Sequence, residues 1–226
     1  MLDTPEISPA APRSALPDGV DLAALVAGKL CHDFISPAGA IASGLDLLDD
    51  PSAADMRDDA LALIAQSSRK MVALVHFARV AFGASTTSES FRTDELRDLV
   101  AGLNDGGRAE LRWRIDDQDV DKSTARTLIN LAWLTLGALP TGGAATVTLK
   151  RADGLLILGG LAEGARARLK GEALAGLKGE PLSEGLQGQW IHPYWLWRTV
   201  HDAGGRLGAT VEDGLVSIGA DLPDNP

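Results

Sequence analysis

The chain has 226 residues, enough for one or two domains with a substantial core. Hydrophobic residues make up 45% of it and charged residues 23%, the profile of a soluble globular protein. The formal net charge is −10 and no block of Lys and Arg occurs, which excludes the charge pattern of a protein that coats nucleic acid or an anionic membrane. We therefore expect neither nucleic acid nor a membrane among its partners.

The N-terminal stretch and the cysteine content favour a cytoplasmic location. Residues 1–20 contain Pro, Ala and acidic residues but no basic start followed by an apolar run, so they predict a disordered tail rather than a signal peptide. No apolar stretch is long enough to cross a bilayer. Cys31 is the only cysteine, which excludes an intramolecular disulfide and a metal–thiolate cluster and fits a reducing compartment.

Residues 21–83 are predicted to form a helical hairpin. Two patterns with apolar residues three and four positions apart flank the turn sequence "DDPS". Ser52, with Asp55 three residues later, is the expected N-cap of the second helix. The apolar positions are Leu22, Val26, Leu30, Phe34, Ile41, Leu45 and Leu48, then Leu61, Ile64, Met71, Leu74, Val75, Ala78 and Phe82. One hairpin cannot cover both stripes, so two chains are expected to form a homodimeric four-helix bundle.

Residues 91–223 follow the linker-like stretch "GASTTSES" and alternate helix and strand patterns. Helices are expected in "TDELRDLVAGL", with Thr93 as N-cap, in "STARTLINLAWLTLGAL" and in "YWLWRTVHDAGG". A strand is expected in "AELRWRI", and two β-hairpins are expected to turn at Asp153-Gly154 and Asp213-Gly214. The pattern predicts helices on one face of a mixed sheet. The expected fold class is therefore a helical hairpin followed by an α/β sandwich.

The sequence "GKLCHDFISPAGAIASGLDLL" places His32 beside Asp33 in the first predicted helix. At about 100° per residue, His32 lies roughly 200° from the apolar stripe, on a face that it shares with small residues. Pro37 lies inside the helical pattern and is expected to kink it. This face would let another protein come close to the imidazole.

A His-Asp pair on a helix is either chemically active or simply solvated. Neutral imidazole is a nucleophile at cytoplasmic pH. A neighbouring carboxylate can accept a hydrogen bond from Nδ1–H, which leaves Nε2 free to attack phosphorus. Solvated pairs are more common, and the dipeptide alone does not decide between the two.

Several longer segments decide it: "CHDFISPA", "SGLDLL", "DPSAADMRDDA", "RVAFGAS", "ARARL", "LAGLKGEPL" and "AGG". From about Leu25 to the last hairpin, the chain resembles the ChpT-type histidine phosphotransferases of alphaproteobacterial phosphorelays. The first segment also resembles the phosphoacceptor helix of two-component histidine kinases. The resemblance implies phosphoryl transfer between receiver-domain aspartates, from a hybrid histidine kinase to response regulators, with His32 as phosphoacceptor and Asp33 as its acidic neighbour. It further implies a homodimer and a C-terminal domain shaped like the ATP-binding domain of histidine kinases.

That C-terminal domain lacks the groups with which a histidine kinase binds ATP and Mg²⁺. Leu134 lies where the resemblance places the metal-binding asparagine, and apolar carbon cannot ligate Mg²⁺. "LILGGLAEGARARL" has Glu163-Gly164 without a second glycine at the required spacing. Residues 189–193 are bulky where glycines would let backbone approach phosphate. We expect no cofactor and no metal in this chain, with Mg²⁺ supplied by the receiver partner.

Two sets of residues are expected to contact a receiver domain. Lys29, Ser36, Ala40 and Ser43 lie around His32 on the first helix. Arg166 and Arg168 alternate in "RARLK", which is either one solvated face or a docking patch for an acidic receiver.

The remaining histidines and tryptophans suggest no further site. His76, His192 and His201 are isolated in the sequence and lack metal-ligand spacing, and the tryptophans at helical positions predict core packing.

Two other functions stay open from sequence. A non-catalytic dimeric protein could sequester a kinase or a response regulator, and His32 would then be replaceable without loss. An ATP-using sensor kinase core would need the missing nucleotide motifs.

Overall fold

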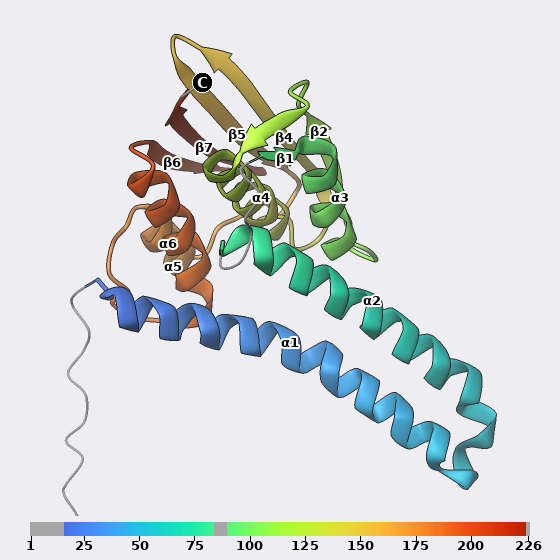
Figure 1. Cartoon of the computed structure of the whole chain (residues 1–226). Coiled ribbons are helices and arrows are strands. Elements are labelled where there is room, and N and C mark those ends of the chain that lie inside the picture. Colours follow the sequence, from blue (N-terminus) through green and yellow to red (C-terminus); the bar gives the residue numbers. More distant parts are fainter. Residues whose placement is uncertain (1–15, 84–89, 225–226) are drawn as a thin grey trace, which may run out of the picture.

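The computed structural model describes residues 16–83 and 90–224, which form a helical hairpin and an α/β domain (Figure 1). The hairpin consists of α1 (Gly19–Asp49), the 3-10 helix η1 (Pro51–Met56) and α2 (Arg57–Ala81). The predicted tail lies outside the described residues up to position 15, and its last two residues, 19 and 20, belong to α1. Positions 84–89 of the predicted linker also lie outside them.

The turn of the hairpin differs from its prediction. Asp50, and not Ser52, is the capping residue, because its carboxylate accepts from the backbone N and the hydroxyl of Ser52 at 2.8 and 2.7 Å. Pro51 explains the difference: its fixed φ suits the first turn of a helix, so a short 3-10 helix starts there and precedes α2.

Helix α1 continues through Pro37, which lies inside it and is buried. The helix changes direction near its middle (Figure 1), as expected where a proline removes one backbone hydrogen bond. Gly44 is buried too, and a Cβ added there would lie 2.6 Å from Ile64. The absence of a side chain at Gly44 therefore lets α1 and α2 approach closely.

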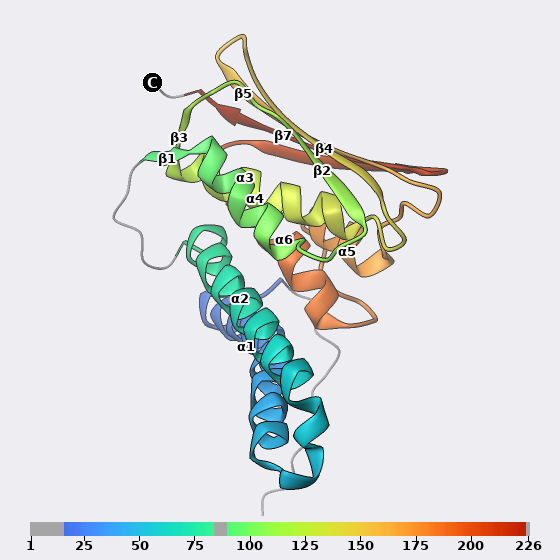
Figure 2. The same cartoon turned by 90° about the vertical axis from the view of Figure 1, so that its right-hand side faces the viewer.

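The α/β domain follows the predicted pattern. Its elements are β1 (Ser90–Arg92), α3 (Thr93–Leu103), β2 (Ala109–Arg114), β3 (Asp119–Asp121), α4 (Lys122–Gly137), β4 (Gly143–Ala152), β5 (Leu155–Glu163), α5 (Gly171–Leu177), α6 (Gln187–Asp202), β6 (Arg206–Glu212) and β7 (Leu215–Pro223). Five strands pair in the order β2-β4-β5-β7-β6, with β2 and β4 parallel and the other pairs antiparallel. Figure 2 shows the helices on one face of this sheet. The predicted fold class, a hairpin followed by an α/β layer structure, is confirmed.

Three local predictions have different outcomes. The turn at Asp153-Gly154 is confirmed, with positive φ values of 51° and 74° that suit a two-residue hairpin turn. Thr93 is not an N-cap: it is the first residue of α3, and its hydroxyl donates to the carbonyl of Asp117 instead. Residues 189–193, predicted to stand where a glycine-rich loop would be, lie in the first two turns of α6 (Gln187–Asp202).

Two apolar clusters hold the molecule together. The larger one lies between the sheet and its helices and includes the end of α2. The smaller one is formed by Trp190, Ile191 and Tyr194 of α6, on which Leu22, Leu25 and Val26 of α1 pack. The hairpin is therefore fixed to the domain by both of its helices. No helix within the described ranges is long and apolar enough to cross a membrane.

Candidate functional site

His32 lies on α1 with 85% of its side chain exposed, as the sequence predicted. This exposure follows from helix geometry, because positions 30, 34 and 37 face the rest of the protein and position 32 points away from them. Nothing within the described residues covers the ring, so a second protein can reach Nε2.

Asp33 uses its two carboxylate oxygens on different neighbours. Oδ1 lies 3.5 Å from Nδ1 of His32, at the outer limit of a hydrogen bond. Oδ2 accepts from Nζ of Lys29, one helical turn earlier. Lys29 and Asp33 are partly buried, with side-chain exposures of 17% and 28%. The Asp33 carboxylate therefore binds Lys29 through one oxygen while the other oxygen lies near His32.

A cavity of about 270 Å³ opens beside this group. Most of its polar lining comes from α1, and its apolar lining comes from both hairpin helices and from the domain. The lining includes Lys29, His32, Asp33, Ser36, Lys70, Trp133 and His192. The site is thus a nucleophilic side chain at the edge of a largely apolar hollow, between the hairpin and the domain.

His192 forms part of this hollow and of a buried network that the sequence did not reveal. Its Nε2 lies 2.7 Å from Oδ1 of Asn130. The Asn130 amide donates to the carbonyls of Ala81 and Arg126 at 2.9 and 2.7 Å. Trp195 Nε1 also donates to Ala81 O, at 2.8 Å. Side chains of α4 and α6 therefore satisfy the last carbonyl of α2.

Burial lowers the pKa of His192 from its ordinary 6.5 to about 3, and the nearby charge of Lys29 acts in the same direction. The imidazole is therefore neutral at neutral pH. Because the amide nitrogen of Asn130 donates elsewhere, its oxygen accepts a hydrogen bond from Nε2–H of His192. His192 is isolated in the sequence, and its partner in the fold lies 62 positions away.

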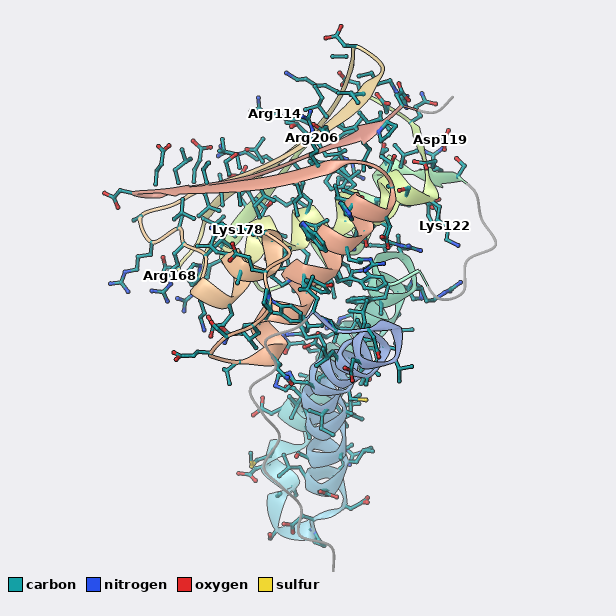
Figure 3. The ribbon with its side chains drawn as sticks, turned by 90° about the vertical axis from the view of Figure 1, so that its left-hand side faces the viewer. Arg114, Asp119, Lys122, Arg168, Lys178 and Arg206 are labelled. Atoms are coloured by element: carbon teal, nitrogen blue, oxygen red, sulfur yellow. The ribbon has the colours of Figure 1, made fainter. Side chains whose placement is uncertain are left out.

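A second cavity, of about 280 Å³, adjoins the first. Both are lined by Lys29, Trp133 and His192. Its outer side carries Arg168 and Lys170 from the loop between β5 and α5, and Figure 3 shows Arg168 pointing outward from the body of the domain.

The structure brings together part of the predicted site. Lys29, His32, Asp33 and Ser36 line one cavity, and Arg168 lines the next. Ser43 is exposed and Ala40 half-buried further along α1, while Arg166 is exposed but lines neither cavity. Sequence reasoning missed the pairing of Lys29 with Asp33, although the spacing of four residues was a signal for it.

Exposure alone does not single out His32. His76 on α2 is also exposed, but it makes no hydrogen bond or ion pair with any described residue. His201 stacks on Trp197 near the end of α6, with ring centroids 5.1 Å apart. His201 is also followed by an acid, Asp202, but that carboxylate accepts from Arg198. Of these three, His32 has a carboxylate near its ring nitrogen and lines a cavity.

Comparisons with known proteins agree with this arrangement. Residues 93–214 match the family described as histidine phosphotransferase C-terminal domain. The protein phosphotransferase ChpT of Brucella abortus (strain 2308) is 30% identical over 197 residues, which cover 86% of this chain and 93% of that protein. A solved structure, described as the 1.7 Å structure of a bacterial phosphotransferase, has a TM-score of 0.80 and 27% identity and covers 92% of this chain and 98% of that one.

A two-domain protein with an exposed histidine on a helical hairpin and these relatives is a protein phosphotransferase. The chain belongs to the histidine phosphotransferase family and acts in a phosphorelay. The expectation of an enzyme is confirmed, and a purely sequestering protein is the less supported alternative.

Proposed function

We propose that His32 is the phosphoacceptor of this phosphotransferase and that it carries a phosphoryl group between the aspartates of two receiver domains. The observation that carries the proposal is the exposed imidazole with Asp33 at its Nδ1, on the rim of a cavity. A receiver of a hybrid histidine kinase is the proposed donor, and receivers of response regulators are the proposed acceptors.

The chemistry requires little of this chain beyond positioning. The lone pair of Nε2 attacks phosphorus, the N–P bond forms, and the P–O bond to the receiver aspartate breaks with its electron pair staying on that carboxylate. The imidazole keeps its proton on Nδ1 and becomes cationic, and Asp33 stabilises it. The receiver supplies Mg²⁺ to the phosphoryl oxygens, so the proposal needs no metal ligand in this chain.

The docking surface for the receiver is proposed to include both cavities. The α1 surface beyond His32 has only small side chains, those of Ser36, Ala40 and Ser43. A receiver can therefore bring its aspartate close to the imidazole. Arg166 and Arg168 lie exposed on the domain side. Their charge suits the acidic surface of a receiver, where it would speed association more than it would raise affinity.

We further propose a homodimer formed through the hairpin. Each helix has an apolar stripe, at the spacing of a helical face, that the chain leaves exposed. The stripes consist of Ile35, Ala38, Ala42 and Leu45 on α1, and of Leu61, Ala65, Val72 and Val75 on α2.

Helix geometry puts both stripes on one side of the hairpin. Phe34 on α1 and Ile64 on α2 face the other helix, and Ile35 and Ala65, the next residue in each helix, belong to the stripes. One residue along a helix is a rotation of about 100°. Because α1 and α2 are antiparallel, these rotations have opposite senses, and both stripes therefore point to the same side of the hairpin. Asp33 lies one residue before Phe34, so the His32 cavity opens on the opposite side and stays accessible in the dimer.

The test of His32 uses a receiver domain that carries radiolabelled phosphate on its aspartate. We expect the wild-type chain to take up label that is labile in acid, as an N–P bond is, and His32→Ala to take up none. His76→Ala is the matched control, because it removes an exposed histidine without an acidic neighbour, and it should transfer at the wild-type rate. Label that persists on His32→Ala would contradict the proposal.

A further inference from the structure

We propose that Lys29 is a positioning residue for phosphoryl transfer: it holds the Asp33 carboxylate toward Nδ1 of His32, and the α/β domain holds Lys29. This inference rests on the proposed role of His32. It replaces the expectation that Lys29 serves to contact the receiver.

The two oxygens of the Asp33 carboxylate have different partners. Lys29 Nζ binds Oδ2 of Asp33, while Oδ1 is the oxygen nearest His32, at 3.5 Å from Nδ1. A carboxylate on a helix surface can otherwise rotate about its side-chain bonds, and each turn of the group would remove Oδ1 from the imidazole. The ion pair with Lys29 fixes this rotation.

The exposed fraction of the side chain increases from Lys29 through Asp33 to His32. Lys29 is 17% exposed, Asp33 28% and His32 85%. Ion pairs on an open surface contribute little, because water competes for both charges and the side chains lose entropy. The Lys29 side chain is mostly buried before it forms the pair, so it loses less side-chain entropy on pairing. Water also competes less for its charge.

Residues of the α/β domain surround the side chain of Lys29. It lines both cavities together with Trp133 of α4 and His192 of α6. His192 is fixed in turn by Asn130, which is fully buried. Side chains of the domain therefore line the space around Lys29, and Lys29 pairs with Asp33 beside His32. Through this arrangement the C-terminal domain would take part in the chemistry.

The decisive experiment uses phosphoramidate, a small phosphoryl donor that needs no docking surface. Its P–N bond breaks, ammonia leaves, and the new N–P bond forms at Nε2 of His32. We expect Lys29→Met to slow this reaction roughly 10- to 100-fold, the range expected for a misplaced catalytic group, and Lys29→Arg to restore most of it. Arg69→Met removes an exposed cation of α2 that lines neither cavity and should leave the rate unchanged. If Lys29 only docks a receiver, Lys29→Met will react with phosphoramidate at the wild-type rate, and the inference is overturned.

A double-mutant cycle tests whether Lys29 acts through Asp33. With a phosphorylated receiver as donor, Lys29→Met should lower kcat more than it changes KM. In an Asp33→Asn background it should change kcat less than twofold, since the group that it positions is then already altered. Equal losses in both backgrounds, with KM raised, would instead assign Lys29 to receiver binding.

A readout without phosphoryl transfer separates this inference from the proposed function. The ¹⁵N shifts of the His32 imidazole report which ring nitrogen carries the proton. We expect Nδ1–H to predominate in the wild type and to lose its predominance in Lys29→Met but not in Arg69→Met. An unchanged tautomer in Lys29→Met overturns the inference even if His32 is phosphorylated. A wild-type His32 that takes no phosphoryl group from any donor overturns the proposed function instead.

Discussion

Asp33 is the residue whose replacement should separate chemistry from folding. Asp33→Asn keeps the size of the side chain but removes the charge that stabilises the phosphorylated imidazolium of His32. We expect transfer from a labelled receiver to slow by about 10²–10⁴-fold, the usual range for acid–base assistance. The variant should stay folded, because it loses one partly buried ion pair and keeps the size of the side chain.

Asp46→Asn is the matched control for Asp33, because Asp46 is an exposed acid on the same helix. It should transfer at the wild-type rate. Equal rates for the two variants would show that no particular acid assists His32.

His192 should make stability depend on pH in a way that a single substitution removes. Its pKa is about 3 in the folded protein and near 6.5 when unfolded, so below pH 6.5 the unfolded state binds a proton that the folded state does not. The free energy of unfolding should therefore fall as the pH falls, by about 2 kcal/mol between pH 7 and pH 5 from this residue. Urea titrations of the wild type and of His192→Gln at both pH values measure it. A loss of the same size in both proteins would show that other groups cause it.

At the scale of helices, the exposed stripe of the hairpin predicts what breaks the dimer. Leu45 is 50% exposed in the single chain, so Leu45→Asp should not unfold the monomer but should bury an unpaired charge in the dimer. Light scattering at micromolar concentration should show a wild-type dimer and a folded Leu45→Asp monomer. Ile157→Asp, on the outer face of the sheet, is the control and should remain dimeric. A wild-type monomer would contradict the proposed bundle.

The buried Asn130 connects three helices, and its loss should loosen the hairpin from the domain. Asn130→Leu keeps the volume but leaves the carbonyl of Ala81 and the ring of His192 each short of one hydrogen bond. We expect a loss of roughly 2–3 kcal/mol in the free energy of unfolding, because the buried Nε2–H of His192 is left without a partner, while Ala81 O keeps its bond from Trp195. Asn104→Ala, which removes one bond to Ala109 O within the domain, should cost about 1 kcal/mol. Similar losses in both would argue against a special role for Asn130.

For the molecule as a whole, the absence of ATP binding is the prediction that most affects its function. The segment that the resemblance places at the glycine-rich loop consists of packed side chains of α6. Trp190 stacks on Tyr194 with ring centroids 4.4 Å apart and donates to Glu180 O. Leu134 faces the cavity beside α4 without a group that can bind Mg²⁺.

Each missing polar contact costs about 1–3 kcal/mol, so two or three together move a micromolar dissociation constant beyond the millimolar range. Calorimetric titration with ATP and Mg²⁺ should show no binding below 1 mM. A micromolar dissociation constant would support the sensor-kinase alternative and contradict this prediction.

The sequence was sufficient for features that short-range physics controls. Hydrophobic periodicity predicted both hairpin helices and most elements of the domain, and Asp-Gly pairs predicted the turn at Asp153-Gly154, because both depend on residues only a few positions apart. The exposed face of His32 followed from the same helical geometry. Capping was less predictable. Asp50 is the cap in place of Ser52, because Pro51 starts a short helix, and the Thr93 hydroxyl donates to Asp117 O instead of capping α3.

Only the tertiary structure decided how the histidine is surrounded. Asn130 and His192 are 62 positions apart, and no local pattern indicates that they meet, because their contact depends on how α4 and α6 pack on the end of α2. The same packing places Trp133 and His192 beside Lys29 and so creates the cavity next to His32. The sequence by itself determined which side chain is exposed and which acid adjoins it. Long-range packing determined what holds that acid in place, because burial and charge neighbours belong to the folded chain and not to any segment of it.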